Sequence, residues 1–255
     1  MDSMEDFEGH LLFADGSSLG NPGPGGWGTV VVLSKQHVVE LGGFEKHTTN
    51  NRMELTGLIE GLRRLEEESG DLTIFTDSKY AHMGSTQWAE GWKRRNWQTM
   101  AKKDVENRDL WEILLAQLED REKFGNITWK HVPGHSGIAG NERCDVIATS
   151  YARLHADTRG QAKEDEPGLF DGEIGDYAVD ILNISIDEEA LEKRKAGKER
   201  AKIKAYSYVS LVDGKVMVHK TWAECEARVK GKKAKFQKVA SKEEEIALVK
   251  KWGGK

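Results

Sequence analysis

The chain has 255 residues, of which 38% are hydrophobic and 32% charged, and its formal net charge is −5. It is long enough for two domains, it contains no apolar run near the about 20 residues of a membrane-spanning helix, and its first residues are acidic and unlike a signal peptide. Its only two cysteines argue against a disulfide framework and a cysteine-based zinc site, so we expect a soluble, cytoplasmic protein.

Valine-rich strands are predicted at the start of the chain. They span His10–Phe13, Trp27–Leu33 and His37–Phe44, separated by the Gly- and Pro-rich turn Gly20–Gly28 and the short turn Ser34–Gln36. Strands that follow one another through short turns predict an antiparallel meander.

Helices and strands alternate in the next part of the chain. Apolar residues recur at helical spacing from about Asn51 to Glu68, and a short buried strand, Leu72–Thr76, follows. The remaining predicted elements are a helix from Ser78 through Trp88 and beyond, a helix Asp109–Phe124, a strand Ile127–Val132 and a helix Gly140–Leu154. This order predicts an α/β fold, a mixed sheet with helices packed on its faces.

The composition changes after His155. Residues 157–176 have the Gly-, Asp- and Glu-rich composition of a linker, and Tyr177–Ile186 alternates weakly, as in a strand that docks elsewhere. Ser185 and Glu188 form a capping box for a charged helix through about Lys204. Tyr206–Trp252 predicts a small β-β-α-β-α module. The predicted domains are therefore residues 8–156, a linker with a charged helix at 157–204, and residues 205–255.

Charge is distributed unevenly along the chain. Residues 1–156 carry a formal charge of −7, residues 157–190 carry −9, and residues 191–255 carry +11. A basic C-terminal part after an acidic segment predicts a polyanionic partner, although a solvated Lys-rich helix is an alternative. The acidic segment is either a plain spacer or a strip that folds back on the basic module and competes with nucleic acid.

Four carboxylates stand at the ends of predicted elements. Asp15 and Asp77 close strands, whereas Glu54 and Asp145 lie in the first turns of helices. Clustered like charges repel one another unless cations neutralise them, and carboxylate oxygens suit Mg²⁺ or Mn²⁺. Two such ions about 4 Å apart would promote hydrolysis of a phosphodiester. Taken singly, each residue is also explained as a turn residue or a helix cap.

Several strings of the sequence resemble the type 1 ribonuclease H family. They occur in the family's order and cover residues 10–155 almost without a gap: Asp15–Gly28, Thr48–Leu55, Thr76–Ser78, Gly134–Gly137 and Gly140–Asp145. The resemblance implies a ribonuclease H fold with a five-stranded sheet, and it carries the catalytic metal-ligand roles onto Asp15, Glu54, Asp77 and Asp145. The implied activity is endonucleolytic hydrolysis of the RNA strand of RNA–DNA hybrids, leaving 3′-hydroxyl and 5′-phosphate ends.

The resemblance also implies cofactors and a loop histidine. Two Mg²⁺ ions would bind with the substrate, and Mn²⁺ is a possible substitute. His135 matches the family's flexible-loop histidine, which shuttles a proton or helps the product leave, and an imidazole that titrates near neutral pH suits either role. Without the resemblance, a single histidine in a loop would be taken as inert.

Two sets of residues are expected to contact the hybrid. Short polar side chains suit the minor groove and the 2′-hydroxyls, and those that match the family's contact positions are Ser17, Asn21, Asn50, Asn51 and Asn141. Lys79 stands where the family commonly has Gln, so a phosphate contact or plain exposure replaces the groove contact. The segment Gln87–Trp97 resembles the basic protrusion that holds the DNA strand, with Lys93, Arg94, Arg95, Lys102 and Lys103 as phosphate contacts. We expect Trp88 to pack between helices and Trp92 or Trp97 to face the deoxyribose.

The C-terminal module resembles the hybrid-binding domain that many eukaryotic members of the family carry. The match rests on Tyr208, Thr221–Cys225, Val229–Gly231 and Lys235–Ser241, and it departs at the turn Val212–Lys215 and in a shorter loop before the third strand. The residues assigned to hybrid binding are Tyr208, Trp222, Phe236 and Lys238. Alternatively, the Trp and the Phe form the core of the module.

The expected partner of the whole chain is an RNA–DNA hybrid duplex. We expect no membrane and no obligate protein partner, and a monomer. A non-catalytic hybrid-binding protein and a junction nuclease of the same fold are the alternatives.

Overall fold

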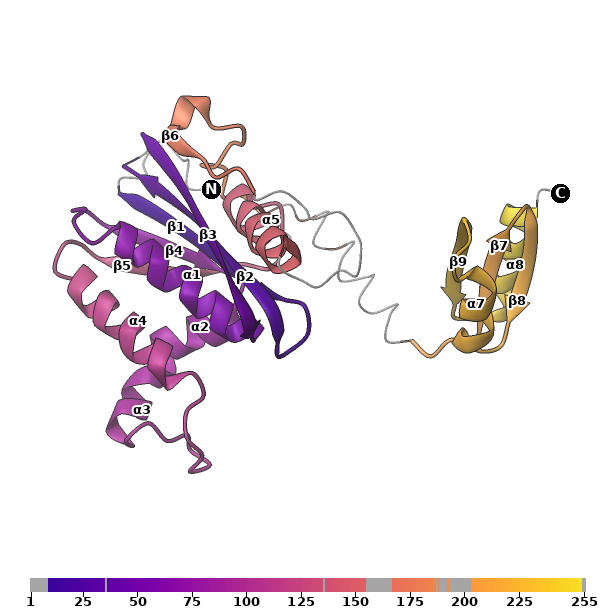
Figure 1. Cartoon of the computed structure of the whole chain (residues 1–255), viewed down its shortest axis with the longest axis horizontal. Coiled ribbons are helices and arrows are strands. Elements are labelled where there is room, and N and C mark those ends of the chain that lie inside the picture. Colours follow the sequence, from indigo (N-terminus) through magenta and orange to yellow (C-terminus); the bar gives the residue numbers. More distant parts are fainter. Residues whose placement is uncertain are drawn as a thin grey trace. The chain divides into compact units, whose positions relative to one another are not determined.

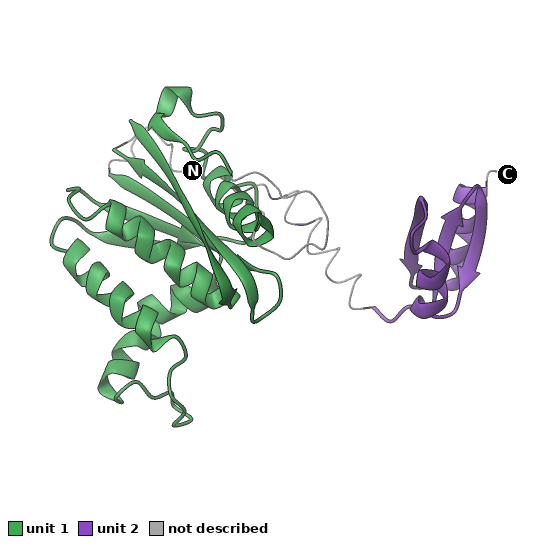
Figure 2. Ribbon diagram, viewed as in Figure 1, with its two compact units in different colours: residues 1–190 green, residues 191–255 purple. Residues whose placement is uncertain are grey.

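The computed structural model describes residues 9–34, 36–134, 136–154, 167–186, 188, 192 and 203–253. The chain divides into two compact units, residues 1–190 and residues 191–255 (Figure 2). The predicted domain limits of 8–156, 157–204 and 205–255 stay a prediction. The charged helix expected through about Lys204 lies, for most of its length, outside the described residues.

A mixed sheet forms the centre of the first unit (Figure 1). Its strand order is β5-β4-β1-β2-β3-β6, where β1 is antiparallel to β2 and parallel to β4. The strands are β1 (His10–Ser18), β2 (Gly23–Leu33), β3 (His37–Thr48), β4 (Leu72–Thr76), β5 (Ile127–His131) and β6 (Asp171–Glu173). The predicted mixed sheet is confirmed, but it has six strands instead of five because β6 pairs with the edge of β3.

The strands at the centre of the sheet are longer than their apolar runs predict. β2 begins at Gly23, inside the segment that was expected to be a turn, and pairs there with the end of β1. The reason is the helix α5 (Ala139–Leu154), which lies directly on this part of β2. A Cβ atom on Gly28 would stand 2.4 Å from the carbonyl oxygen of Cys144, so glycine here permits close approach of helix and strand.

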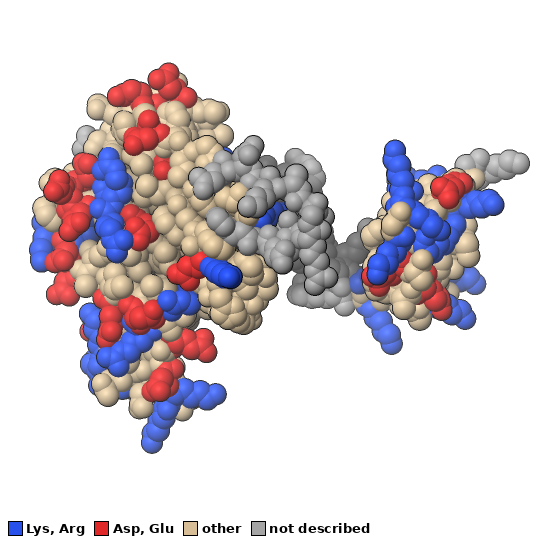
Figure 3. Space-filling model, in the orientation of Figure 1, with Lys and Arg blue, Asp and Glu red and all other residues tan. Residues whose placement is uncertain are grey.

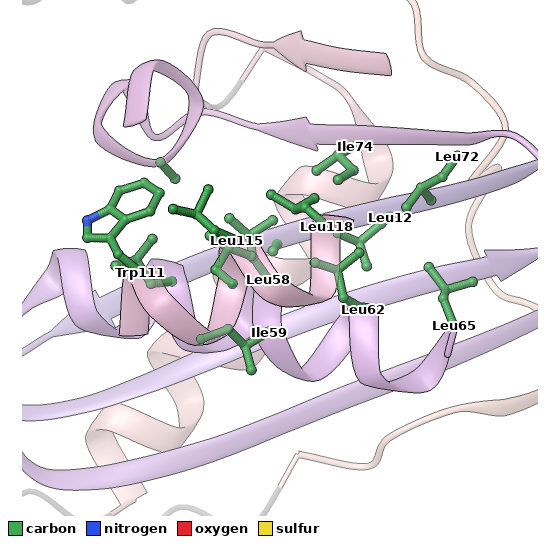
Figure 4. Packing of buried hydrophobic residues seen from close by; sticks show 14 of the residues in the cluster. Leu12, Leu58, Ile59, Leu62, Leu65, Leu72, Ile74, Trp111, Leu115 and Leu118 are labelled. Atoms are coloured by element: carbon green, nitrogen blue, oxygen red, sulfur yellow. The ribbon is translucent and has the colours of Figure 1, made fainter. Parts of the chain in front are cut away.

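Helices cover both faces of the sheet. On one face lie α1 (Asn50–Arg64) and α4 (Arg108–Arg121), and on the other lies α5. Thr49 caps the N-terminus of α1, where its side chain accepts a hydrogen bond from the N–H of Arg52. Figure 4 shows how side chains of α1 and α4 pack with those of the sheet, among them Leu12, Leu58, Leu62, Ile74, Trp111, Leu115 and Leu118. Packing on both faces fixes the strand ends that carry the site.

The predicted helix after Ser78 is divided into three parts. These are α2 (Lys79–Met83), a π turn η2 (Gly84–Trp88) and α3 (Ala89–Arg94). A π turn inserts one extra residue and so rotates the part of the helix that follows it. Ala89 and Trp92 consequently face the core, and Trp88 turns outward.

Residues 167–184, which we call the strap, pack on the α5 face of the first unit. The strap contains β6 and a short 3-10 helix η3 (Ile174–Asp176). Its side chains Phe170, Ile174, Tyr177, Ile181, Leu182 and Ile184 join the apolar cluster beneath α5. The prediction of a linker is therefore wrong for residues 167–176, and the predicted strand at Tyr177–Ile186 is wrong, although this segment does dock. Residues 157–166 lie outside the described residues.

The second unit is a three-stranded antiparallel sheet with a helix on each face. Its elements are β7 (Ser207–Val212), β8 (Lys215–His219), α7 (Trp222–Val229), β9 (Ala234–Val239) and α8 (Lys242–Gly253). Val209, Val239 and Leu248 form the core under α8, whereas Val212, Cys225 and Val229 form the core under α7. The predicted β-β-α-β-α order is confirmed.

Within the described ranges, none of the helices has the length and apolar character that crossing a membrane requires.

Candidate active site

Asp15 lies inside β1, before its end at Ser18, and Asp77 directly follows the end of β4, so the prediction that Asp15 closes its strand is wrong. β1 and β4 pair in a register that sets Phe13 opposite Phe75, and the two rings stack with centroids 4.7 Å apart. Residues two positions further along a strand project on the same face, so the same register sets Asp15 beside Asp77. Both carboxylates therefore project toward the face that α5 covers.

Glu54 and Asp145 approach these strand ends from the helices. Glu54 lies in the second turn of α1 and is buried. A Cβ atom on Gly16 would stand 2.3 Å from the backbone nitrogen of Glu54, so glycine after Asp15 allows α1 to press against the end of β1. Asp145 is half-buried in α5, where Thr149 Oγ1 donates a hydrogen bond of 3.3 Å to Asp145 Oδ1. The structure thus brings the four predicted carboxylates together from four different elements.

Asp15 is the electrostatic centre of this group. Burial, together with the negative charges of Asp77, Asp145 and Glu54, raises the pKa of Asp15 from 3.8 to about 8, although the 2.7 Å hydrogen bond from the Gly16 N–H lowers it. Burial also raises the pKa of Glu54, and the negative charge of Asp77 raises it as well. Burial and neighbouring negative charge thus disfavour ionisation of Asp15 and Glu54.

The donor set fits a divalent cation in its chemistry. Within the described ranges, no three His, Cys, Asp or Glu side chains converge tightly enough to hold one ion as they stand. Mg²⁺, however, keeps several waters and is held by one or two carboxylates together with substrate phosphates, so a closed protein cage is not required. A cation beside Asp15 would also relieve the repulsion that raises the pKa of this residue.

The Glu54 carboxylate accepts hydrogen bonds from two neighbouring side chains, of which only one was predicted to be functional. Asn50, predicted to contact substrate, donates from Nδ2 to Glu54 Oε1 at 2.9 Å. Ser78, to which the sequence assigned no role, donates its hydroxyl hydrogen to Glu54 Oε2. In the sequence, Ser78 stands in the string Thr76–Ser78 that resembles the family and at the start of a predicted helix, and neither feature indicated a contact with Glu54.

The predicted groove contacts do not all lie on one surface. Asn21 is exposed, and its Oδ1 accepts a hydrogen bond from the backbone N–H of Asn50 at 3.3 Å. Ser17 and Asn51 are half-buried at the end of β1 and the start of α1. Asn141 differs from these residues because it is only 3% exposed, and its Oδ1 has no hydrogen-bond partner among the described residues.

The predicted basic protrusion carries exposed cations. Lys and Arg side chains gather at the end of the first unit that holds α3 (Figure 3). The predicted cations of the protrusion are all exposed, namely Lys93, Arg94, Arg95, Lys102 and Lys103, and Lys79, for which either a phosphate contact or plain exposure was expected, is exposed too. This surface therefore has the charge that contact with a nucleic-acid backbone requires.

The roles predicted for the tryptophans are reversed in the structure. Trp92 and Trp97 are only 7% and 8% exposed and belong to the core, so the prediction that one of them faces a deoxyribose is wrong. Trp88, expected to be packed, is 38% exposed. The π turn explains why Trp88 is exposed and Trp92 is buried. Trp97 has a backbone φ of 61° and is buried, and the Arg108 guanidinium lies 5.4 Å from the centre of its ring.

Aromatic rings form a row on the second unit. The rings of Tyr208 and Trp222 are 5.6 Å apart, and those of Trp222 and Phe236 are 5.3 Å apart. Trp222 is 40% and Phe236 is 52% exposed, and the core of the unit is formed by other residues, so the alternative that these two rings form its core is wrong. Lys238, on the same strand as Phe236, is half-buried.

The loop histidine predicted to take part in catalysis, His135, lies outside the described residues.

Comparisons with known proteins agree with this arrangement. The sequence profile described as RNase H matches residues 8–153. A ribonuclease H of Solibacter usitatus is 49% identical over 142 residues, which cover 56% of this chain and 93% of that protein. A ribonuclease H of Thermosynechococcus vestitus is 47% identical over 144 residues, which cover 56% of this chain and 87% of that protein.

Solved structures share the fold of the first unit. The crystal structure of LC9-RNase H1, described as a type 1 RNase H with the type 2 active-site motif, is 28% identical with a TM-score of 0.50, covering 65% of this chain and 78% of that one. A foamy viral protease-reverse transcriptase is 17% identical, also with a TM-score of 0.50, covering 60% of this chain and 21% of that one. This second likeness concerns the fold alone.

Proposed function

Because the chain belongs to the ribonuclease H family, we propose how its residues carry out the hydrolysis of RNA in RNA–DNA hybrids. The chain is a ribonuclease H, an endoribonuclease that acts on such hybrids. We assign the reaction to the site around Asp15, with Glu54, Asp77 and Asp145. The observation that carries this assignment is that all three of these carboxylates interact electrostatically with the buried Asp15.

Family members depend in general on divalent metal ions. We infer two Mg²⁺ ions, for which Mn²⁺ is a substitute, held by the four carboxylates when substrate is bound. Asp15 would be a ligand, because the charges of the other three carboxylates act on it. Such ions would supply an activated water and would stabilise the leaving 3′-oxygen, which would give 3′-hydroxyl and 5′-phosphate ends.

The protein's own residues prepare this site. Asp15 gives up a proton when it becomes a ligand, since its pKa of about 8 keeps it largely protonated at neutral pH in the free protein. Asn50 and Ser78 each donate a hydrogen bond to one oxygen of Glu54, which favours its ionised form and fixes its direction. Thr149 supports Asp145 in the same way.

His135 is proposed to move a proton or to assist product release. The support is its place in the sequence, between β5 and α5, and the suitability of an imidazole for proton transfer.

We propose that the hybrid is gripped at two places on the first unit. Asn50 contacts Glu54 and is joined to Asn21 by a hydrogen bond, and the two side chains supply amides for the minor groove of the hybrid. The exposed cations of the protrusion, including Lys93, Lys102 and Lys103, supply contacts to the DNA phosphates.

The second unit is proposed to tether the enzyme to hybrids. Its exposed pair Trp222 and Phe236 is suited to stacking on sugars, and lysines surround this pair in the sequence. A tether of this kind raises the local concentration of substrate without a new catalytic contact. The chain is proposed to act as a monomer without an obligate protein partner.

Matched RNA–DNA, RNA–RNA and DNA–DNA duplexes test the substrate class. With Mg²⁺ and the full chain, we expect cleavage of the RNA strand in the first duplex alone, with products that carry 5′-phosphate and 3′-hydroxyl ends. Comparable cleavage of the DNA–DNA duplex would favour a junction nuclease. Binding of the hybrid without any cleavage in Mg²⁺ or Mn²⁺ would favour a non-catalytic hybrid-binding protein.

A further inference from the structure

Glu40 joins three parts of the first unit at a single buried carboxylate. It lies on β3 and is only 3% exposed. Arg143 of α5 binds it through two hydrogen bonds, from Nε at 2.6 Å and from Nη2 at 2.7 Å. The strap adds a hydrogen bond from the Tyr177 hydroxyl at 2.5 Å and one from the Phe170 N–H at 3.1 Å. Both oxygens of the carboxylate are therefore shared between α5 and the strap.

The strap contacts the same arginine directly. Arg143 Nη2 donates a further hydrogen bond of 3.0 Å to the carbonyl oxygen of Gly168. The carbonyl oxygen of Phe170, in the strap, also accepts a hydrogen bond of 2.7 Å from the backbone N–H of Glu40. The Phe170 and Tyr177 rings pack 4.9 Å apart, and Ile181 is fully buried in the cluster beneath α5.

The charge of Glu40 depends on these donors. Burial alone would raise the pKa of Glu40, but the hydrogen bonds from Arg143, Tyr177 and Phe170 outweigh burial and lower the pKa below its ordinary value. A buried ion pair is favourable only when further hydrogen bonds satisfy its remaining lone pairs and protons. The strap supplies these bonds, so it completes the pair.

Arg143 lies two residues before Asp145, in the first turns of α5. The next residue, Cys144, has its carbonyl oxygen close to Gly28 of β2, so the neighbouring strands β2 and β3 both hold this part of the helix. The Glu40 pair and the β2 contact together fix how the start of α5 is rotated. That rotation decides where Asp145 points.

We propose that the strap is a positioning element of the catalytic unit, in which Tyr177 and Ile181 hold the start of α5 so that Asp145 faces Asp15. The strap lies beyond residue 153, where the match to the RNase H profile ends. The inference rests on the proposed role of Asp145 as a metal ligand.

Two substitutions in the full chain test the strap, each with a matched control. Tyr177→Phe removes only the hydroxyl that binds Glu40, and Tyr206→Phe removes an exposed hydroxyl elsewhere. Ile181→Ala loosens the buried anchor of the strap without touching Glu40, and Val179→Ala shortens an exposed strap residue. Three quantities are measured: hydrogen exchange of the amides 143–147 in chelator, Mn²⁺ binding by its paramagnetic resonance signal without substrate, and the Mg²⁺ concentration for half-maximal cleavage.

Tyr177→Phe and Ile181→Ala are expected to speed amide exchange at the start of α5. They are also expected to weaken Mn²⁺ binding and raise the Mg²⁺ requirement by about tenfold, as seen when residues that orient metal ligands are altered. Saturating Mg²⁺ should restore the wild-type rate, hybrid affinity should not change, and both controls should behave as wild type.

A lowered melting temperature with an unchanged metal requirement would overturn the inference, because the strap would then only stabilise the fold. Asp145→Asn is measured in parallel to separate the two levels of the argument. An inactive Asp145→Asn with a wild-type metal requirement in Tyr177→Phe would overturn the role of the strap alone. A fully active Asp145→Asn would overturn the proposed site and this inference with it.

Discussion

Ser78 donates its hydroxyl hydrogen to Glu54 Oε2 and, with the same oxygen, accepts a hydrogen bond of 3.1 Å from the backbone N–H of Ala81. One side chain therefore caps α2 and directs a carboxylate that belongs to α1. Since Asn50 serves the other oxygen of Glu54, both of its oxygens have a donor in the free protein. The site is thus arranged in part by residues that have no charge.

Ser78→Ala should lower kcat/KM by roughly 10- to 100-fold, because loss of a group that orients a metal ligand typically has this effect. The change also removes a helix cap, which costs about 1 kcal/mol of the free energy of unfolding. Thr221→Ala is the control, since Thr221 caps α7 in the second unit without touching Glu54. Equal activity of the two variants would show that the contact with Glu54 is unimportant.

Asp15→Asn should stabilise the metal-free protein at alkaline pH. The pKa of Asp15 is about 8 in the folded protein and 3.8 ordinarily, so the folded state favours the protonated form. Stability from this preference is fully present below about pH 4 and is lost as the pH rises through about 8. In chelator at pH 9, the variant should therefore have a free energy of unfolding higher by on the order of 2–5 kcal/mol, with little difference at pH 4.

Urea unfolding at both pH values measures this difference. Asp104→Asn is the matched control, because Asp104 is exposed. If the free energies of unfolding of Asp15→Asn and wild type differed by the same amount at pH 4 and at pH 9, Asp15 would not have a raised pKa in the folded protein.

The sequence predicted well those parts of the fold that depend on local pattern. Leu72–Thr76 was predicted with its observed limits, because a short apolar run bounded by turn residues is typical of a buried strand. Asp15 and Asp77 were found because each follows such a run, and the register of β1 and β4 then brings them together. The site was accessible to prediction for this reason.

The errors arose where a distant segment decides the outcome. The Gly- and Pro-rich segment before Trp27 resembles a turn in sequence, but it belongs to β2, and α5 packs closely over its Gly26. Trp88 and Trp92 exchange roles because a π turn leaves no clear mark in the sequence. Residues 167–176 have the composition of a linker, but the edge of β3 and the apolar cluster beneath α5 give the strap a place to dock.

Lys102→Ala combined with Lys103→Ala should weaken hybrid binding mainly at low salt. Each lost phosphate contact lowers the slope of log affinity against log salt by about 1, so the slope of the double variant should fall by about 2. KM should rise, and kcat should stay near that of wild type. The measurement is hybrid affinity across a salt series.

Lys123→Ala is the control for these lysines. Lys123 lies just beyond the end of α4, and its Nζ forms an ion pair of 2.5 Å with Asp120 Oδ1. An unchanged salt slope in the double variant would remove the protrusion from the binding surface.

Trp222→Ala and Phe236→Ala should each cost the full chain about 1–3 kcal/mol of hybrid binding energy, the range for loss of one aromatic ring from a nucleic-acid stacking platform. Both rings are exposed on the α7 side of the sheet. Ile246→Ala is the control, because Ile246 is an exposed apolar residue of α8 on the other face. Affinity measured in chelator, without cleavage, is the readout, and equal affinity of all three variants would leave the second unit without a tethering role.

The central claim is that RNA cleavage depends on a metal site built around Asp15. Single-turnover cleavage of an RNA–DNA hybrid by wild type and by Asp15→Asn, in saturating Mg²⁺, tests this most directly. A bound ion is worth several kcal/mol in the transition state, so the variant should cleave roughly 10²- to 10⁴-fold more slowly while it still binds the hybrid and unfolds no more easily than wild type. A folded Asp15→Asn protein that cleaves at the wild-type rate would contradict the account.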